Sequence, residues 1–281
     1  MKKILIIGIK GMAGHVIYNY LKKCGNFNVF GIARNISETQ NEFSLDVSDT
    51  NKLSKIIHEG AYDYVVNCIG ILNKDAEDNP AKAIWFNSYF PHFLEETTKG
   101  RATKVIHIST DCVFNGKKGS YAEGDLKDGI GYYAQSKALG EIENTKDLTI
   151  RTSIIGPELN PNGIGLFHWF MNQSGDINGY TTAIWSGVTT LELANAVRSA
   201  MEKPITGLVH LTNGTPINKY ELLSIFKEIW KTEVNINPFE GKITDKSLVK
   251  SSRFDYHVPT YEQMLKSQYE WMNEFSNLYT Y

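Results

Sequence analysis

Tyr133 and Lys137 lie four residues apart, and they are the two side chains from which an acid–base chemistry can first be argued. In a helix this spacing brings both groups to one face, one turn from each other. A free phenol has a pKa near ~10, and a neighbouring ammonium lowers that pKa toward the range of a working general acid. Tyr18 and Lys22 show the same spacing, which we interpret as an ordinary exposed pair, so the surrounding elements must distinguish the two pairs.

A glycine-rich turn follows the first predicted strand. Residues 4–7 form a short apolar run, which is typical of a strand covered on both faces. Gly8, Gly11 and Gly14 follow, and a helix is predicted over residues 15–23. Glycines at this spacing permit a tight turn and let the backbone approach a pyrophosphate, which then faces the helix N-terminus. A glycine turn without a ligand is the alternative, but the order strand, turn, helix favours a dinucleotide.

Arg34 follows the second strand, which we predict over residues 28–32. A carboxylate at this point would accept hydrogen bonds from the ribose of NAD, whereas a guanidinium can pair with the 2′-phosphate of NADP. We therefore expect NADPH, with NADH as the alternative if Arg34 is only a solvated loop residue. Asp46 ends a third strand predicted over residues 43–46, where it would either meet the adenine edge or begin the next helix.

Strands and helices continue to alternate through the first half of the chain. This alternation is typical of a parallel, doubly wound α/β sheet of the Rossmann type, in which ligands bind beyond the carboxyl ends of the strands. A strand over residues 64–70 ends in Cys68, Ile69 and Gly70, which would let a cofactor cross its tip. His107 lies between apolar neighbours, so we expect it to be packed and not to act as a ligand. The remaining predicted elements are strands over residues 105–108 and 147–151 and helices over residues 49–58 and 79–99.

A polar segment follows the strand at residues 105–108 and is expected to face the reacting group. Thr110 would present a hydroxyl to the cofactor crevice, and Asp111 and Cys112 come directly after it. The helix that carries Tyr133 and Lys137 comes next along the chain.

Together these motifs resemble the extended short-chain dehydrogenase/reductase family. The resemblance covers essentially the whole chain. The shared features are Gly8-x-x-Gly11-x-x-Gly14, Asp46 after the third strand, Asn67 to Gly70, a hydroxyl at Thr110, and Tyr133-x-x-x-Lys137. More narrowly, a second motif is similar to the signature of dTDP-4-dehydrorhamnose reductases and their relatives, and it reads Ser109-Thr110-Asp111-x-Val113-Phe114-x-Gly116.

The resemblance implies a function and a role for the main residues. The protein would use NADPH to reduce the 4-keto group of a nucleotide-linked 4-keto-6-deoxy-hexose, in the synthesis of a surface polysaccharide sugar. Tyr133 would protonate the ketone oxygen, and Thr110 would hydrogen-bond the carbonyl and orient it. Lys137 would hold the nicotinamide ribose and lower the pKa of Tyr133.

The resemblance also implies which residues contact each ligand, and it implies no metal site. The residues expected to bind the cofactor are Gly8, Gly11, Met12, Gly14, Arg34, Asp46, Val47, Cys68, Ile69, Gly70, Tyr133 and Lys137. Those expected to contact the nucleotide sugar are Thr110, Asp111, Cys112, Tyr133 and Trp185. A basic loop could face a diphosphate, although a solvated face is the alternative for each of its residues, which are Lys242, Lys246, Lys250 and Arg253.

Cys112 stands where rhamnose-type reductases usually carry a tyrosine. In the related GDP-fucose synthases a catalytic cysteine occupies the corresponding place, so Cys112 could catalyse epimerisation with a histidine such as His168 as its partner. The alternative is a small substitute for tyrosine that lines the pocket. A bifunctional epimerase/reductase is therefore one rival hypothesis, and a non-catalytic NADP-binding regulatory subunit, like that of methionine adenosyltransferase, is another. A dehydratase is disfavoured, because Asp111 is followed by Cys112 and not by glutamate.

The chain is expected to form one large domain and a smaller part. An NADP-binding Rossmann domain is predicted over residues 1–155, and residues 187–212 are expected to return to it. A smaller mixed α/β part, made of residues 156–186 and 213–281, would bind the substrate. The aromatic residues near its end could pack on this part or on a second subunit, so a homodimer is one possibility.

Composition limits the other classes of partner. The net charge of −2 gives no basic excess that would indicate nucleic acid. No apolar run reaches the ~18 residues needed to span a membrane. The three cysteines are widely spaced and include no CxxC pair, which disfavours metal ligation and disulfides and favours a cytoplasmic location.

Overall fold

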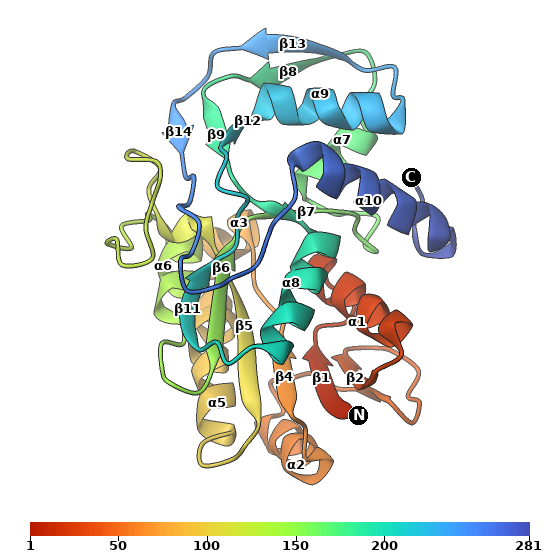
Figure 1. Cartoon of the computed structure of the whole chain (residues 1–281), viewed down its shortest axis with the longest axis vertical. Helices are drawn as coiled ribbons and strands as arrows, with labels where there is room; N and C mark the ends of the chain where they lie inside the picture. The colour runs from red at the N-terminus through yellow and green to blue at the C-terminus, as the bar shows by residue number, and fades with distance from the viewer.

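A seven-stranded parallel sheet forms the centre of the molecule, as the computed structural model of residues 1–281 shows (Figure 1). Its strands are β1 (Lys2–Ile7), β2 (Phe27–Ala33), β3 (Glu42–Ser44), β4 (Tyr64–Asn67), β5 (Lys104–Thr110), β6 (Leu148–Thr152) and β11 (Gly207–His210). The strand order is β11-β6-β5-β4-β1-β2-β3, and every neighbouring pair is parallel. The order reverses between β1 and β4, and ligands of open α/β sheets bind at such a reversal. The predicted Rossmann-type fold is confirmed.

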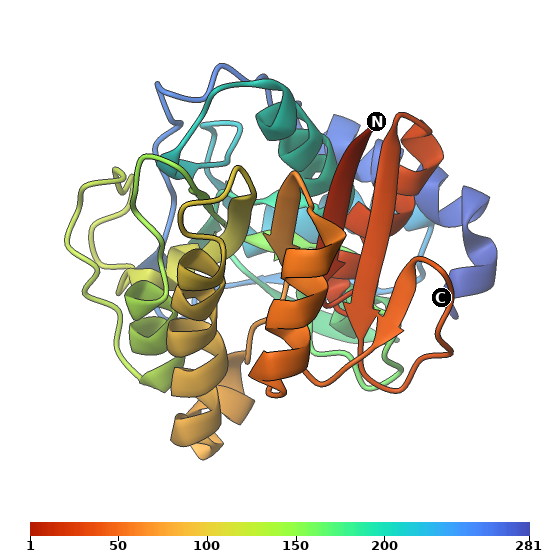
Figure 2. The same cartoon turned by 90° about the horizontal axis from the view of Figure 1, so that it is seen from below.

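Helices cover both faces of this sheet (Figure 2). They are α1 (Met12–Cys24), α2 (Thr50–Gly60), α5 (Phe90–Thr97), α6 (Tyr132–Leu139) and α8 (Thr190–Glu202). Successive strand residues point to opposite faces. Ile4 and Ile6 of β1 therefore belong to the hydrophobic cluster under α1 and α8, whereas Leu5 and Ile7 belong to the cluster under α2 and α5. This two-sided burial explains why β1 is apolar throughout.

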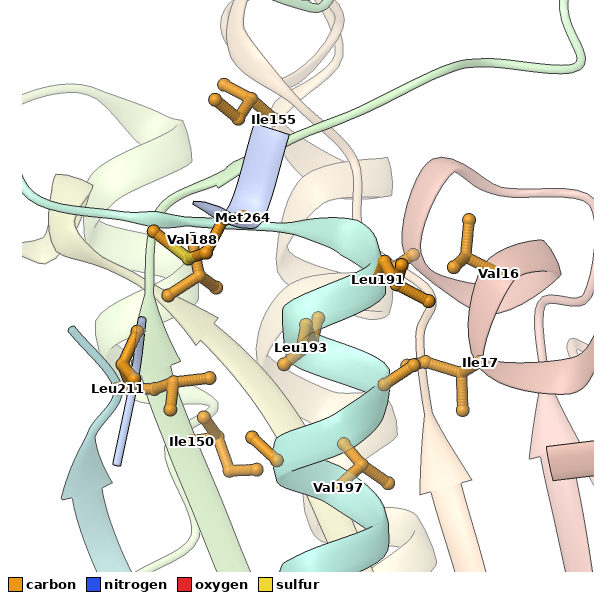
Figure 3. Close-up of a cluster of buried hydrophobic side chains, with 14 of the residues drawn as sticks. Val16, Ile17, Ile150, Ile155, Val188, Leu191, Leu193, Val197, Leu211 and Met264 are labelled. Carbon is orange, nitrogen blue, oxygen red and sulfur yellow. The ribbon is translucent and has the colours of Figure 1, made fainter. Parts of the chain in front are cut away.

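Helix α8 lies beside α1 on one face of the sheet (Figure 3). Leu191 and Val197 of α8 approach Val16 and Ile17 of α1, and Ile150 of β6 lies on the other side. Burial of such side chains is the main stabilising term of the fold, at roughly 1.5–3 kcal/mol for each one. Both α8 and β11 follow a stretch of chain that lies outside the central sheet. Strand β11 then adds the last strand to this sheet, and α8 covers part of one face. The exact domain boundaries drawn from the sequence stay a prediction.

A smaller mixed α/β part lies beyond the carboxyl ends of the central strands (Figure 1). Its strands β9, β12 and β14 form one small sheet, and β8 pairs with β13 and β7 with β10. None of the helices combines the length and the apolar sequence needed to cross a bilayer. The elements are β7 (Ile154–Ile155), α7 (Leu166–Met171), β8 (Asp176–Tyr180), β9 (Ala183–Trp185), β10 (Val188–Thr189), β12 (Ile217–Asn218), α9 (Lys219–Trp230), β13 (Asn235–Phe239), β14 (Thr244–Asp245) and α10 (Tyr261–Glu274).

The helix predicted over residues 79–99 is present as an unbroken helical run from Pro80 to Thr97, with Asn79 before its first turn, but it contains a π turn that was not predicted. The run consists of α4 (Pro80–Ala83), the π-helical turn η1 (Ile84–Tyr89) and α5, and a separate short helix, α3 (Asn73–Asp78), precedes it. Pro91, which has no backbone N–H to donate, follows the π turn closely. The turn directs Asn87 inward, where its Nδ2 donates to Oγ of Ser136 over 3.0 Å. An irregular turn thus contacts the helix that carries Tyr133, and π turns are frequent at functional sites.

The ends of two strands also differ from the prediction. The strand predicted over residues 64–70 ends at Asn67, because Asn67 Oδ1 accepts a hydrogen bond from the backbone N–H of Ile69 over 3.1 Å and turns the chain out of the sheet. Strand β5 is longer than expected and includes Thr110 as its last residue. Thr110 therefore stands at the tip of a central strand and not in a loop beyond it.

Candidate active site

A cavity of about 370 Å³ opens at the carboxyl ends of β1, β2 and β4. The predicted cofactor residues that line it are Gly8, Gly11, Arg34, Asp46, Val47, Cys68, Ile69 and Gly70. The other four, Met12, Gly14, Tyr133 and Lys137, do not line it. The lining also contains residues that sequence reasoning did not single out for the cofactor, among them Lys10, Asp75, Lys82 and Phe86.

The glycine turn fits a pyrophosphate in three ways. Gly8 has a φ of +98°, a left-handed conformation that side chains disfavour. A Cβ on Gly14 would lie 2.1 Å from the carbonyl oxygen of Gly8, so only glycine lets α1 approach β1 this closely. No side chain caps the N-terminus of α1 at Gly11, which leaves its first N–H groups for an anion.

Arg34 and Asp46 form an ion pair at the edge of this cavity. The guanidinium Nη1 of Arg34 lies 3.5 Å from Oδ2 of Asp46. Hydrogen bonds from Ser48, and then Arg34, hold the pKa of Asp46 below its usual range. The helix-starting role that was the alternative for Asp46 belongs to Asp49, which accepts from the N–H of Lys52 and caps α2. Arg34 is mostly exposed and therefore free to meet a phosphate.

Helix α6 is anchored at both its first turn and its middle. The backbone N–H groups of Tyr132 and Tyr133 both donate to the carboxylate of Glu77, each over 3.1 Å. Gly131, with a φ of +94°, leaves room for this carboxylate, since a Cβ there would lie 2.6 Å from it. Ser136 is held from η1, where Oγ of Ser88 donates to its carbonyl oxygen over 2.7 Å. These contacts fix the direction in which the phenol of Tyr133 points.

Three polar side chains lie close enough to the phenol of Tyr133 to act on its pKa. Burial raises the pKa of Tyr133 above its ordinary value, and the neighbouring Cys112 and Asp111 act in the same direction, whereas the hydroxyl of Thr110 opposes the shift. The structure thus brings Thr110, Asp111, Cys112 and Tyr133 to one place. The phenol stays protonated at neutral pH, which is the form of a general acid.

Lys137 does not act on Tyr133 in this structure. Its Nζ donates to the carbonyl oxygen of Ile108 over 2.8 Å and lies 3.4 Å from Nε2 of His107. Burial lowers the pKa of Lys137 to about 8. The expected lowering of the Tyr133 pKa by Lys137 is therefore not found in the protein without its cofactor, because the amine is held by other groups and burial raises the pKa of the phenol. Lys137 does lower the raised pKa of Cys68 in the cavity wall, which places its amine beside the cofactor crevice.

The pairing of Cys112 with His168, which epimerisation would require as the alternative to a pocket-lining cysteine, does not occur. His168 Nδ1 lies 2.6 Å from the hydroxyl of Tyr281, and its Nε2 lies 3.4 Å from Nδ2 of Asn172. Burial and Asp111 raise the pKa of Cys112 to about 11, so the thiol keeps its proton at neutral pH. A thiolate base with this histidine partner is absent from the site.

Trp185 meets the site through a lysine that sequence reasoning missed. Nζ of Lys219, the first residue of α9, lies 5.3 Å from the centre of the Trp185 ring. Burial lowers the pKa of Lys219 to about 8, and Asp111 and Cys112 oppose that shift, so the ammonium lies within reach of both. Of the basic loop, Lys246 also acts on Asp111 and Cys112. The pairing of β12 with β9 brings Lys219 to Trp185, and no local sequence signal announces it.

The fold and the site define a Rossmann-type dinucleotide-binding protein with a tyrosine and a lysine on one helix beside the cofactor crevice. A profile of the RmlD substrate binding domain family matches residues 1–268, and the chain belongs to this family. The family recognised from the sequence is therefore confirmed, and with it the oxidoreductase class that it implied.

Several proteins of known name are similar to the chain. The probable low-salt glycan biosynthesis reductase Agl14 of Haloferax volcanii is 32% identical over 140 residues, which are 48% of this chain and 46% of that relative. The spore coat polysaccharide biosynthesis protein SpsK of Bacillus subtilis is 28% identical, with 81% of this chain and 79% of that protein covered. The dTDP-4-dehydrorhamnose reductase of Aggregatibacter actinomycetemcomitans is 27% identical, with 87% and 85% covered.

Solved structures show the same fold. The dTDP-4-dehydrorhamnose reductase of Bacillus anthracis in complex with NADP superimposes with a TM-score of 0.81 at 18% identity, over 96% of this chain and 99% of that one.

One sequence relative has a different kind of name. Subunit beta of methionine adenosyltransferase 2 from Bos taurus is 22% identical, with 90% of this chain and 78% of that protein covered.

Proposed function

We propose that this protein uses NADPH to reduce the 4-keto group of a nucleotide-linked 4-keto-6-deoxy-hexose, in the synthesis of a surface polysaccharide sugar. One observation carries the proposal: Thr110, Cys112 and the protonated phenol of Tyr133 gather at the same edge of the sheet as the cavity that the glycine turn lines. Relatives named as a dTDP-4-dehydrorhamnose reductase and as a spore coat polysaccharide protein support the choice of substrate and context.

Tyr133, Thr110 and Lys137 each have a task in this reaction. NADPH, when bound, supplies the hydride to the ketone carbon. Tyr133 donates its proton to the ketone oxygen, and the Thr110 hydroxyl orients that oxygen. Lys137, next to Cys68 in the cavity wall, binds the nicotinamide ribose and stabilises the phenolate left on Tyr133.

The cofactor preference follows from the cations at the cavity edge. Arg34 and Lys10 both line the cavity, and a 2′-phosphate could pair with their positive charges. Arg34→Asp is expected to lower kcat/KM for NADPH by about tenfold or more and to raise the relative rate with NADH, because one phosphate contact is worth ~1.5–3 kcal/mol. Lys3→Asp, a change outside the cavity lining, is the matched control. An unchanged ratio of the two cofactors in Arg34→Asp would refute the NADP assignment.

The test of the function itself is NADPH oxidation with a panel of dTDP-, UDP- and GDP-linked 4-keto sugars. Turnover with at least one of them is expected. Tight NADPH binding without turnover would instead favour a regulatory subunit, the role that the bovine relative makes a second candidate. Incorporation of solvent deuterium beside the ketone would indicate epimerisation through Cys112.

A further inference from the structure

A chain of contacts joins the wall of the cofactor cavity to Lys137 through a buried histidine. The backbone N–H of Ile69, a residue of the cavity lining, donates to Oδ1 of Asn67 over 3.1 Å. Nδ2 of Asn67 lies 3.1 Å from Nδ1 of His107, and Nε2 of His107 lies 3.4 Å from Nζ of Lys137. Asn67 and His107 are both fully buried, so these contacts are formed away from solvent.

The backbone end of this chain fixes the direction of each contact. The N–H of Ile69 can only donate, so the oxygen of Asn67 faces it and the NH2 group of Asn67 faces His107. Nδ1 of His107 must then accept. Burial lowers the pKa of His107 well below its ordinary value, so the ring is neutral and its single proton is on Nε2, the atom that faces Lys137.

This arrangement distinguishes between the two forms of Lys137. An ammonium has three N–H donors and no acceptor, so it meets the N–H of His107 as donor against donor. An uncharged amine has a lone pair, which can accept from Nε2–H while one of its own N–H groups donates to the carbonyl of Ile108 over 2.8 Å. Only the uncharged amine satisfies both neighbours.

We propose that His107 is a positioning residue that holds the Lys137 amine against β5 and favours its uncharged form in the protein without cofactor. The inference rests on the proposed function, in which the charge on Lys137 supports Tyr133. Cofactor binding has to overcome this preference, because the ribose contacts and the phenolate both need the ammonium. His107 therefore adds to the effect of burial and lowers the pH above which the free enzyme loses the cation beside its cofactor site.

Other titratable groups lie near His107 and Lys137, and a substitution of His107 leaves all of these side chains in the protein. Cys68 and Glu141 both act on Lys137, but burial keeps the Cys68 thiol protonated, and Glu141 is paired with Arg151 at 2.7 Å. His92 acts on His107 and is itself paired with Glu95 at 2.8 Å. Tyr133 lies one turn from Lys137 on the same helix.

Two matched variants test the proposal. In His107→Asn the side-chain amide lies only near the place of Nδ1 and leaves the place of Nε2 empty. In His107→Gln the longer side chain carries its amide to the place of Nε2, where it can still donate to Lys137. The measurement is kcat/KM for NADPH against pH, because this quantity reports the pKa values of the free enzyme. We expect a decline at alkaline pH in the wild type, a decline displaced upward by roughly half a pH unit or more in His107→Asn, and a near-wild-type decline in His107→Gln. A decline in His107→Asn that is unmoved or moved downward overturns the proposal.

A second measurement needs no turnover. The NMR spectrum of the cofactor-free protein with 15N-labelled histidine reports which ring nitrogen carries the proton, and either variant identifies the His107 signal by its loss. A neutral ring with its proton on Nε2 from pH 6 to 9 is expected, and a proton on Nδ1 or a charged ring contradicts the inference. If the NMR result is as expected but no keto sugar is turned over, the proposed function fails and the histidine assignment stands.

Discussion

The same four-residue spacing of tyrosine and lysine occurs on two helices and leads to two different arrangements. On α1, Nζ of Lys22 lies 4.9 Å from the centre of the Tyr18 ring. On α6, Nζ of Lys137 donates to the carbonyl of Ile108 and does not lie over the ring of Tyr133. The sequence interpretation of the α1 pair as exposed is half right, because Lys22 is exposed but Tyr18 is buried.

The difference shows what spacing can and cannot decide. Spacing puts two side chains on one face of a helix. The surroundings then choose the partner: Lys22 reaches solvent and only covers a ring, whereas Lys137 is enclosed and must give its hydrogens to protein acceptors. The hydroxyl of Tyr18 is already used, because it donates to Glu42 over 2.7 Å, while the phenol of Tyr133 keeps its proton for a ligand.

The largest predicted difference between the two tyrosines is in turnover. Tyr133→Phe removes the proton donor and is expected to lower kcat by roughly 10²–10⁴-fold, because general acid catalysis contributes this much. NADPH binding, followed by its fluorescence, should change little. Tyr18→Phe is the control, and it should leave kcat within about threefold while costing ~1 kcal/mol of unfolding free energy for the lost hydrogen bond. Turnover of Tyr133→Phe within tenfold of the wild type would end the catalytic assignment.

The next effect concerns the pH dependence of stability. The Lys137 pKa of about 8 lies below the ~10.4 of an unfolded lysine, so the unfolded chain binds more protons between these values and stability rises with pH across them. Lys137→Met should remove a rise of about 3 kcal/mol relative to the wild type, at ~1.4 kcal/mol for each pH unit. Denaturant unfolding at pH 7 and pH 10 measures it. Lys22→Met, the matched variant on α1, should show no such difference; equal pH curves for both variants would contradict the argument.

A smaller effect is expected at the start of α6. Glu77→Ala leaves the two N–H groups of the first turn without their acceptor, which should cost ~0.5–2 kcal/mol of stability, as for other helix caps. Because the same contact aims Tyr133, kcat should fall by more than KM changes. Glu77→Gln keeps an acceptor oxygen and should recover part of both. Recovery of stability without recovery of kcat would show that the carboxylate does not position the phenol.

The smallest effect is that of the exposed cation itself. Lys22→Met removes the charge over the Tyr18 ring, and an exposed contact of this kind is worth only ~0.5–1 kcal/mol. Chemical denaturation at neutral pH should detect this loss without any change of turnover. A loss as large as that expected for a buried pair would remove the distinction between the two helices.

The sheet and its glycine turn could be predicted from the sequence because their signals are local. Apolar runs mark strands that are buried on both faces, and a glycine at position 14 is required by a contact with Gly8 only six residues away. The long helix predicted over residues 79–99 is present over residues 80–97, but its π turn was not predicted, because a π turn leaves the same apolar pattern on the sequence as a regular α-helix. The hydrogen bonds that distinguish the two are not encoded by composition.

The substrate side of the site was predicted less completely for a physical reason. Thr110, Asp111 and Cys112 are neighbours in the chain, and their motif is visible. Lys219 meets Trp185 only because two short strands pair across the smaller part, and such pairings depend on packing far from either residue. Lys246, which reaches the same place from a third segment, was noticed for its charge and not for its position.

The late return of the chain to the central sheet also constrains how this protein can be made. A nascent chain that ends near residue 155 has six of the seven strands but neither β11 nor α8, so the area beside α1 that α8 covers stays open to solvent. This hydrophobic area can close only after residues 190–202 have been made. We therefore expect a fragment of residues 1–155 to be captured by chaperones where the whole chain is released.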